Sequence, residues 1–391
     1  MNLVQRQQRL DGLLAAFQPL WHAQPFRELR PAWCAEWPAL ASALLALDDA
    51  AEAHLAADDA AATALVARHI PELGELLDLV DLADCQAAAP PEVGRFWAWG
   101  IPGRKRAQIE AFAAAARCSQ RPVIDWCGGK GHLGRLLALN WDQGVTTLEI
   151  DHVLCAEGAE LAERAGAEQQ FVATDVREPG RYLQGGRHAV ALHACGDLHR
   201  TLVAGAAGQG LAALDLAPCC YYRGIHGSYE PLSGALLNRL STEGARLAVT
   251  ELVTAAPRQA RQRDREMAWK LGFDVWRRQA SGSDGYRNFR PVPAPWMRGS
   301  FAEFMVLLAG RESLPVPGAH QVDLLEQSGW ARQREVMRLS VVRHVFRRPL
   351  EVWLALDLAV RLQNDGYSVS LGRFCERRLT PRNLLISARL N

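Results

Sequence analysis

Short apolar runs alternate with amphipathic stretches through the middle of the chain. The runs are typical of strands, and the stretches between them place apolar side chains at helical spacing. This alternation indicates parallel βαβ units with right-handed crossovers, so we expect an α/β, doubly wound, mostly parallel Rossmann-like sheet. The ligand crevice of such a sheet lies at the carboxyl ends of the strands. The predicted strands are 122–125, 145–149, 169–172, 188–193 and 211–216, and the predicted helices between them are 131–139, 155–165 and 197–207.

The two ends of the chain follow other patterns. Residues 1–90 are rich in Ala and Leu at helical spacing, which predicts an all-helical N-terminal appendage. An Ala- and Pro-rich linker follows, and we expect a second domain over residues 91–391. Within that domain we predict a basic insertion around 221–300, a late strand at 301–309, a C-terminal extension from about 341, a helix at 350–362 and a final strand near 384–387.

Composition places the chain among ordinary globular proteins and excludes a disordered or collagenous one. Of the 391 residues, 49% are hydrophobic and 22% are charged. The formal net charge is +1, but residues 1–100 carry −8 and residues 101–391 carry +9. We therefore expect residues 101–391 to bind a polyanionic substrate. No apolar run reaches the ~18 residues of a membrane span, and the N-terminus lacks a hydrophobic signal core. With nine cysteines expected as thiols, we predict a cytoplasmic protein without a membrane partner; the sequence indicates no oligomeric state.

A glycine cluster follows the first predicted strand and opens a helix. Gly128, Gly129 and Gly131 allow a ligand to approach the backbone, with Cys127 and Lys130 beside them. The spacing fits neither a dinucleotide nor a P-loop fingerprint. Asp125 precedes the glycines, and an acid there suits a ligand with a cationic amino-acid end.

Three further acids follow the next two strands. Glu149 closes the second strand, where a carboxylate can accept both hydroxyls of a ribose. Asp151 could compete for that role, and Asp175 could accept from an adenine amino group. An acid, a glycine loop and acids on three successive strands together predict S-adenosylmethionine (SAM) as the cofactor.

Histidine and cysteine gather after the fourth and fifth strands. Because both strands end at the same rim, we expect five side chains to line the acceptor side of the crevice. His193 or Asp197 is the expected proton carrier, and His193 also borders the cofactor. The predicted catalytic residues are His193, Cys195, Asp197, Cys219 and Cys220.

Four interpretations of this cluster compete. Zinc is disfavoured because the adjacent cysteines are poor chelates, and we expect no metal. A cysteine nucleophile for C5 methylation of a pyrimidine is supported only by Pro218-Cys219. A non-covalent pocket is the third interpretation, and small buried thiols without a role are the fourth.

The motifs resemble a group of class I SAM-dependent methyltransferases. The segments that show this resemblance best are Asp125-Trp-Cys-Gly-Gly-Lys-Gly-His-Leu133, Leu192-His-Ala-Cys-Gly-Asp-Leu198 and Ala217-Pro-Cys-Cys-Tyr-Tyr222. Three further segments, before and after these, also resemble the group: Ile101–Glu110, Pro349–Asp357 and Leu379–Leu384. The group includes eukaryotic methyltransferase-like proteins and the methyltransferase half of the glutathione-S-transferase C-terminal-domain-containing protein. More distantly it includes tRNA acceptor-stem 2′-O-methyltransferases, whose paired cysteines precede histidines; here Tyr221 and Tyr222 follow instead. The resemblance implies a Rossmann-like methyltransferase domain that binds SAM.

Arginines and aromatic residues interleave from 258 to 298, where ten bases face four acids. Arginine contacts phosphates and aromatic rings stack on bases, so we predict RNA as partner and substrate. We expect a methyltransferase for structural RNA, at a ribose 2′-hydroxyl or a base. The alternatives are a protein or small-molecule methyltransferase, and a non-catalytic module that binds SAM or RNA. The predicted RNA contacts are Arg258, Arg261, Arg265, Arg277 and Arg278.

Overall fold

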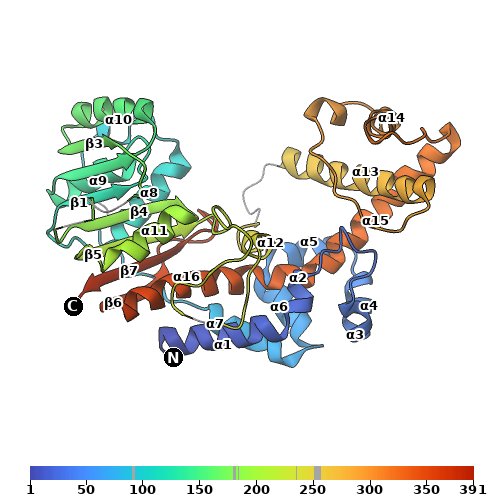
Figure 1. Cartoon of the computed structure of the whole chain (residues 1–391), viewed down its shortest axis with the longest axis horizontal. Coiled ribbons are helices and arrows are strands. Elements are labelled where there is room, and N and C mark those ends of the chain that lie inside the picture. The colour runs from blue at the N-terminus through green and yellow to red at the C-terminus, as the bar shows by residue number, and fades with distance from the viewer. Residues whose placement is uncertain (90–92, 179–181, 184, 235, 251–256) are drawn as a thin grey trace. The chain divides into compact units, whose positions relative to one another are not determined.

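The computed structural model describes residues 1–89, 93–178, 182–183, 185–234, 236–250 and 257–391. A seven-stranded sheet is its central feature, with the strand order β3-β2-β1-β4-β5-β7-β6 (Figure 1). The strands are β1 (Val123–Trp126), β2 (Val145–Glu149), β3 (Gln169–Ala173), β4 (His188–Cys195), β5 (Ala213–Cys219), β6 (Tyr367–Arg373) and β7 (Leu384–Leu390).

The first five strands are parallel and the last two pairings are antiparallel. Val123 of β1 pairs with Val145 of β2 on one side and with His188 of β4 on the other. The strand order therefore reverses between β1 and β4, and this switch point is where an open α/β sheet binds its ligand. The mixed α/β, mostly parallel and Rossmann-like sheet expected from the sequence is thus confirmed.

Helices cover both faces of this sheet. Helix α9 packs against β1, β2, α8 and α10, whereas α11 packs against β4 and α16. Val123 belongs to the core beneath α8 and α9, while its neighbour Ile124 is fully buried as well, as expected for a strand covered on both faces. These helices are α8 (Gly103–Ala115), α9 (His132–Trp141), α10 (His152–Ala165), α11 (Asp197–Ala206) and α16 (Arg347–Asn364).

The chain divides into two compact units whose segments alternate along the sequence. Unit 1 contains the sheet and consists of residues 1–16, 75–251 and 346–391; unit 2 consists of residues 17–74 and 252–345. The smaller helices of unit 1 are α1 (Leu3–Ala16), α7 (Leu76–Val80), α12 (Thr242–Leu247) and the 3-10 turn η2 (Arg95–Ala98).

The expected division at residues 90/91 differs from these units. Helix α1 packs on α16, and the buried Asp11 carboxylate accepts the indole N–H of Trp353 at 3.0 Å and the side-chain amide of Asn238 at 2.7 Å. These contacts join the first helix to the unit that contains the sheet. The sequence alone gave no sign that a helix at residue 3 would pack on one beginning at residue 347.

The secondary-structure elements among the described residues of unit 2 are all helices, joined by loops. Its longest helices, α13 and α15, approach closely because Gly329 faces the backbone of Ala268, and Gly272 faces that of Leu325; a Cβ at either glycine would collide. The elements are α2 (Gln18–His22), α3 (Trp33–Glu36), α4 (Pro38–Leu45), α5 (Asp49–Ala57), α6 (Asp59–Ala67), η1 (Pro71–Glu75, which ends in unit 1), α13 (Pro257–Ser281), η3 (Ala294–Met297), α14 (Phe301–Glu312) and α15 (Ala319–Val345).

The strand predicted at 301–309 is wrong, because these residues form α14. Ser300 and Glu303 make a capping box, in which each side chain accepts from the other residue's backbone N–H. The buried positions Phe301, Phe304 and Leu308 repeat with helical spacing. A continuous apolar run cannot by itself distinguish a strand from a buried helix.

Candidate functional site

The glycine loop joins β1 to α9 at the switch point of the sheet. Gly131 begins α9 with φ +60°, and a Cβ there would collide with Gln169 and Phe171. Gly129 has φ +59°, but a Cβ there would meet no described atom within 4 Å. Glycine at 131 is thus required by packing, whereas the backbone at Gly129 is left uncovered by described atoms, so a ligand could approach it there.

Asp125 supports this loop from below. Its side chain is 1% exposed and accepts hydrogen bonds from the Gly134 N–H at 3.1 Å and the Thr147 hydroxyl at 3.3 Å. Burial raises the pKa of Asp125 to about 6, against the opposing effect of these bonds. The carboxyl group is therefore enclosed beneath the loop, and its predicted contact with a ligand stays a prediction.

Glu149 reaches from the end of β2 to the glycine loop. One carboxylate oxygen accepts the Gly129 N–H at 3.0 Å, and the other accepts the Ile150 N–H at 2.9 Å and the Asp151 N–H at 3.1 Å. Asp151 is instead the N-cap of α10, where it accepts the amides of the first helical turn. Of these two acids, Glu149 is therefore the one that lies beside the loop.

Three other predicted cofactor residues are Asp175, Lys130 and Cys127, and the first two form ion pairs. Asp175 forms an ion pair with Arg177, whose Nε lies 2.9 Å from Oδ2, and these contacts lower the pKa of Asp175. Lys130 forms an ion pair with Glu157 on α10. Cys127 has φ +57°, and burial raises its pKa to about 12, so it remains a thiol. An adenine contact by Asp175 requires release from Arg177 or sharing with it.

His193 lies where β4 bulges away from β5. The register shifts between Leu192 and Cys195, and His193 adopts φ +64°. Its Nε2 lies 3.0 Å from Oε1 of Gln108 on α8, and Nδ1 is buried without a hydrogen-bond partner among the described residues. Burial lowers the pKa of His193 to about 4, so its ring is neutral at pH 7. A neutral imidazole with a free nitrogen can accept a proton.

The three strand-end cysteines converge, as the sequence predicted. The sulfurs of Cys195, Cys219 and Cys220 all lie within 4.8 Å of one another, and those of Cys195 and Cys219 are 3.4 Å apart. The Cys219 thiol also donates to the His193 carbonyl at 3.2 Å. The pKa of Cys220 lies below that of an ordinary thiol because the other two thiols and Arg223 favour its thiolate, whereas the pKa of Cys219 is raised.

Tight contacts between the two strand-end loops fix this cluster. Gly196 has φ +52°, and a Cβ there would collide with the Arg223 carbonyl oxygen. A Cβ on Gly224 would collide with the Asp197 carboxylate, which therefore lies against the loop after β5. Tyr221 is fully buried with its ring edge-on to His199. Of the predicted catalytic residues, Asp197 lies at this contact, and its backbone N–H donates to the Arg223 carbonyl at 3.2 Å.

Three residues around the cluster were not among the predicted site residues. Gln108 bonds to His193, and the positive charges of Arg223 and Arg382 both act on Cys220. Arg382 also lies 3.6 Å from the buried carboxylate of Glu351. Gln108 and Arg382 belong to segments quoted above for the family resemblance, and that was the signal that could have identified them.

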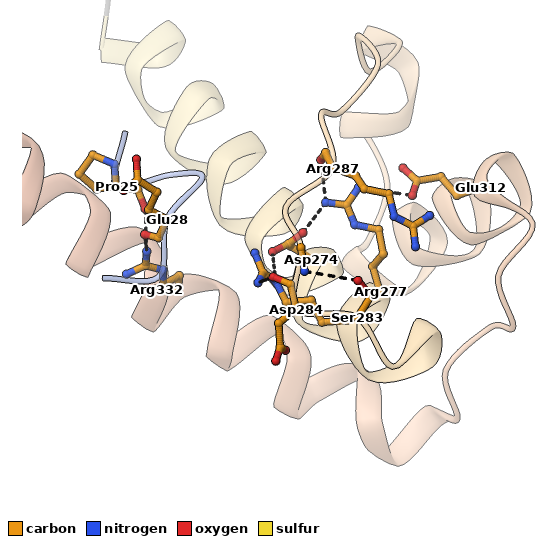
Figure 2. A network of polar contacts seen from close by, with 11 residues as sticks. Pro25, Glu28, Asp274, Arg277, Ser283, Asp284, Arg287, Glu312 and Arg332 are labelled. Atoms are coloured by element: carbon orange, nitrogen blue, oxygen red, sulfur yellow. Dashed lines mark hydrogen bonds and ion pairs between the residues drawn. The ribbon is translucent and has the colours of Figure 1, made fainter. Parts of the chain in front are cut away.

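The five predicted RNA-binding arginines fall into two groups. Arg258 and Arg261 are exposed on the first turns of α13. Arg277 is 2% exposed and binds Asp274, Glu312 and the Arg287 carbonyl (Figure 2), so it holds unit 2 together and cannot reach a phosphate as placed. Arg278 and Arg265 likewise bond within unit 2, to Asp274 and to the Met297 carbonyl. The sequence could not distinguish surface arginines from these structural ones.

Comparison with known proteins identifies the sheet-bearing region. Residues 104–223 match the family model of a methyltransferase domain, Methyltransf_32. This match extends from α8 through the glycine loop and Glu149 to the strand-end cysteines. No curated protein and no solved structure matches the chain. Among the described helices, none combines the length and apolarity needed to cross a bilayer. The chain therefore contains a methyltransferase domain over residues 104–223. The glycine loop, Glu149, His193 and the three strand-end cysteines lie inside this range, whereas Arg382 and the arginines of α13 lie outside it.

Proposed function

We propose that this chain is a SAM-dependent methyltransferase that modifies RNA. The observation that carries the cofactor assignment is the open backbone at Gly129 beside the Glu149 carboxylate, at the switch point of the sheet. The donor set fits SAM: the loop accommodates the close approach of a ligand, and Glu149 can accept ribose hydroxyls. SAM supplies a methyl group on a sulfonium sulfur, which an acceptor nucleophile takes.

In this proposal the chain's own residues position the acceptor and move one proton. His193 is neutral and has a free, buried Nδ1, so it can take the proton that a hydroxyl or amine loses as it is methylated. Gln108 fixes the ring through Nε2. His193 lies near the carboxyl end of β4, which borders the switch point, and this position supports a role on the acceptor side of the crevice.

Positive charge supports an anionic acceptor. Lys105 and Arg382 act electrostatically on His193, and Arg223 is exposed beside Cys195 and Cys220. Exposed Arg258 and Arg261 provide further cations in unit 2. Phosphates are the groups that clustered arginines and lysines bind in nucleic acids, which favours RNA over a neutral metabolite.

Cofactor binding is tested by calorimetric titration of the full-length protein with SAM. Glu149→Ala removes the carboxylate proposed to accept the ribose hydroxyls. SAM affinity should fall at least about tenfold, which corresponds to the loss of one hydrogen bond to a charged group. Glu160→Ala removes an exposed carboxylate of α10, 4.0 Å from Arg164, and serves as the matched control with unchanged affinity. Failure of the unaltered protein to bind SAM would overturn the proposal.

RNA binding is tested separately with the Arg258→Ala/Arg261→Ala double variant. Both side chains are exposed, so folding should be unchanged while RNA affinity falls and its salt dependence becomes shallower. Arg164→Ala removes one exposed arginine on α10 as a control for general charge loss. Equal RNA affinities for the double variant and the unaltered protein would exclude this surface as an RNA contact.

A further inference from the structure

The proposed mechanism assigns no role to the three converging thiols. Cys195, Cys219 and Cys220 bring all three sulfurs within 4.8 Å of one another, and each cysteine is free. No other His, Cys, Asp or Glu atoms form such a group in the part of the chain that the structure describes. Cys219 is buried, whereas Cys195 and Cys220 are partly exposed. The group is therefore both preassembled and reachable from outside.

The sulfur separations fit a trithiolate metal site. Zinc–sulfur bonds are about 2.3 Å long, which places sulfurs about 3.8 Å apart in a tetrahedral site. The separation of 3.4 Å between Cys195 and Cys219, and the 4.8 Å limit for all three pairs, lie on either side of that value. Small side-chain rotations are thus enough to bring the three sulfurs onto one ion.

The backbone shows how adjacent cysteines can share one site. Cys220 adopts φ +44°, which turns the chain so that its sulfur joins that of Cys219 instead of pointing to the opposite face. His193, on the other strand, adopts φ +64° within the bulge between Leu192 and Cys195. Left-handed conformations of ordinary residues cost about 1–3 kcal/mol each and cluster at functional sites. The sequence-based objection to adjacent cysteines as chelates therefore does not apply to this geometry.

The local charge also suits a metal thiolate. Three thiolates and one Zn²⁺ carry a net charge of −1, and Arg223 and Arg382 act on these sulfurs with positive charge. Binding would release the thiol protons to solvent, including the one that Cys219 donates to the His193 carbonyl. No oxidant is consumed and no bond other than S–H is broken.

We infer that Cys195, Cys219 and Cys220 bind one Zn²⁺ through their Sγ atoms. Soft thiolate ligands select zinc over hard cations such as Mg²⁺. Three protein ligands leave a fourth position open, which water or a heteroatom of the acceptor can fill. This inference does not depend on the proposed cofactor or on RNA as the acceptor.

The test measures zinc in the full-length protein, expressed with zinc supplied and purified under reducing conditions. Mass spectrometry of the metal content should give about one zinc per chain. Replacement with Co²⁺ should give thiolate-to-cobalt charge-transfer absorption. Cys195→Ser, Cys219→Ser and Cys220→Ser should each lower zinc affinity at least about tenfold. Cys34→Ser alters a half-buried cysteine of unit 2 and should retain the metal.

Two results would overturn the inference. One is reduced, zinc-reconstituted protein that holds no stoichiometric zinc, and the other is zinc retained by the triple serine variant. If Cys219→Ser fails to fold, the partly exposed Cys220→Ser and chelator titration of the unaltered protein decide the question, with circular dichroism as the folding control. Titration of the same samples with SAM distinguishes the two proposals, because a protein that binds SAM but no zinc contradicts only the zinc site.

Discussion

Gly129→Ala is the substitution that isolates the open face of the glycine loop. In the described structure an added Cβ at position 129 meets no atom within 4 Å, so the methyl group harms no packing. Only the backbone penalty of a non-glycine residue at φ +59° remains, about 1–2 kcal/mol. If a cofactor lies on this backbone, the methyl group occupies space that the cofactor needs.

Gly166→Ala supplies the matched control. Gly166 ends α10 with φ +66°, and a Cβ there is equally free of described neighbours. Both variants should therefore lose the same 1–2 kcal/mol of unfolding free energy, roughly, in chemical denaturation. Their SAM affinities should differ: Gly129→Ala should lose at least about tenfold, or about 1.4 kcal/mol, while Gly166→Ala should match the unaltered protein. Equal dissociation constants for the two variants would refute the assignment of this loop to the cofactor.

Three further predictions concern stability. Burial lowers the pKa of the fully buried His199 to about 4. As the pH falls below about 6.5, this histidine is protonated in the unfolded chain before it is protonated in the folded one. The free energy of unfolding should therefore drop by about 3 kcal/mol between pH 6.5 and pH 4 because of this residue. Asp125, with a pKa of about 6, changes the free energy of unfolding in the opposite direction over this pH range. The His199→Gln variant should show a weaker dependence of unfolding free energy on pH, and an unchanged dependence would count against a neutral buried His199. Arg277→Ala should cost about 3 kcal/mol in denaturant unfolding because it removes one partner of the buried Asp274, whereas exposed Arg258→Ala should stay within about 0.5 kcal/mol; similar losses would mean that Arg277 is not the structural residue described above. Ser300→Ala removes the capping box of α14 and should cost about 1 kcal/mol in thermal unfolding, and no loss would show that the cap is not formed in solution.

The sheet was readable from the sequence where strands alternate with helices. The five parallel strands lie within three residues of their predicted bounds, because runs such as 145–149 are bounded by turn signals and buried on both faces. β6 was missed although Asp365 and Gly366 separate it from α16, because its alternation of buried and exposed positions was not recognised as a strand. α14 was predicted as a strand because its capping residue Ser300 was not weighed against its apolar composition.

The candidate site was predictable in its residue types and less so in its contacts. Strand-end position alone brought His193 and Cys219 together, because parallel strands end at one rim. The periodicity could not show that Asp125 would be enclosed beneath the loop or that Asp151 would cap α10. Nor could it show that Arg277 would be buried, since only tertiary packing brings Glu312 and the Arg287 carbonyl to its guanidinium.

Methyl transfer to RNA is the claim on which the account depends most. The direct measurement incubates the purified full-length protein with methyl-labelled SAM and bulk RNA from a strain that lacks this gene, followed by nucleoside mass spectrometry. We predict one labelled nucleoside, whose yield at limiting SAM falls when Glu149→Ala replaces the unaltered protein, and its identity separates ribose from base methylation. SAM binding without any labelled nucleoside would contradict RNA as the acceptor.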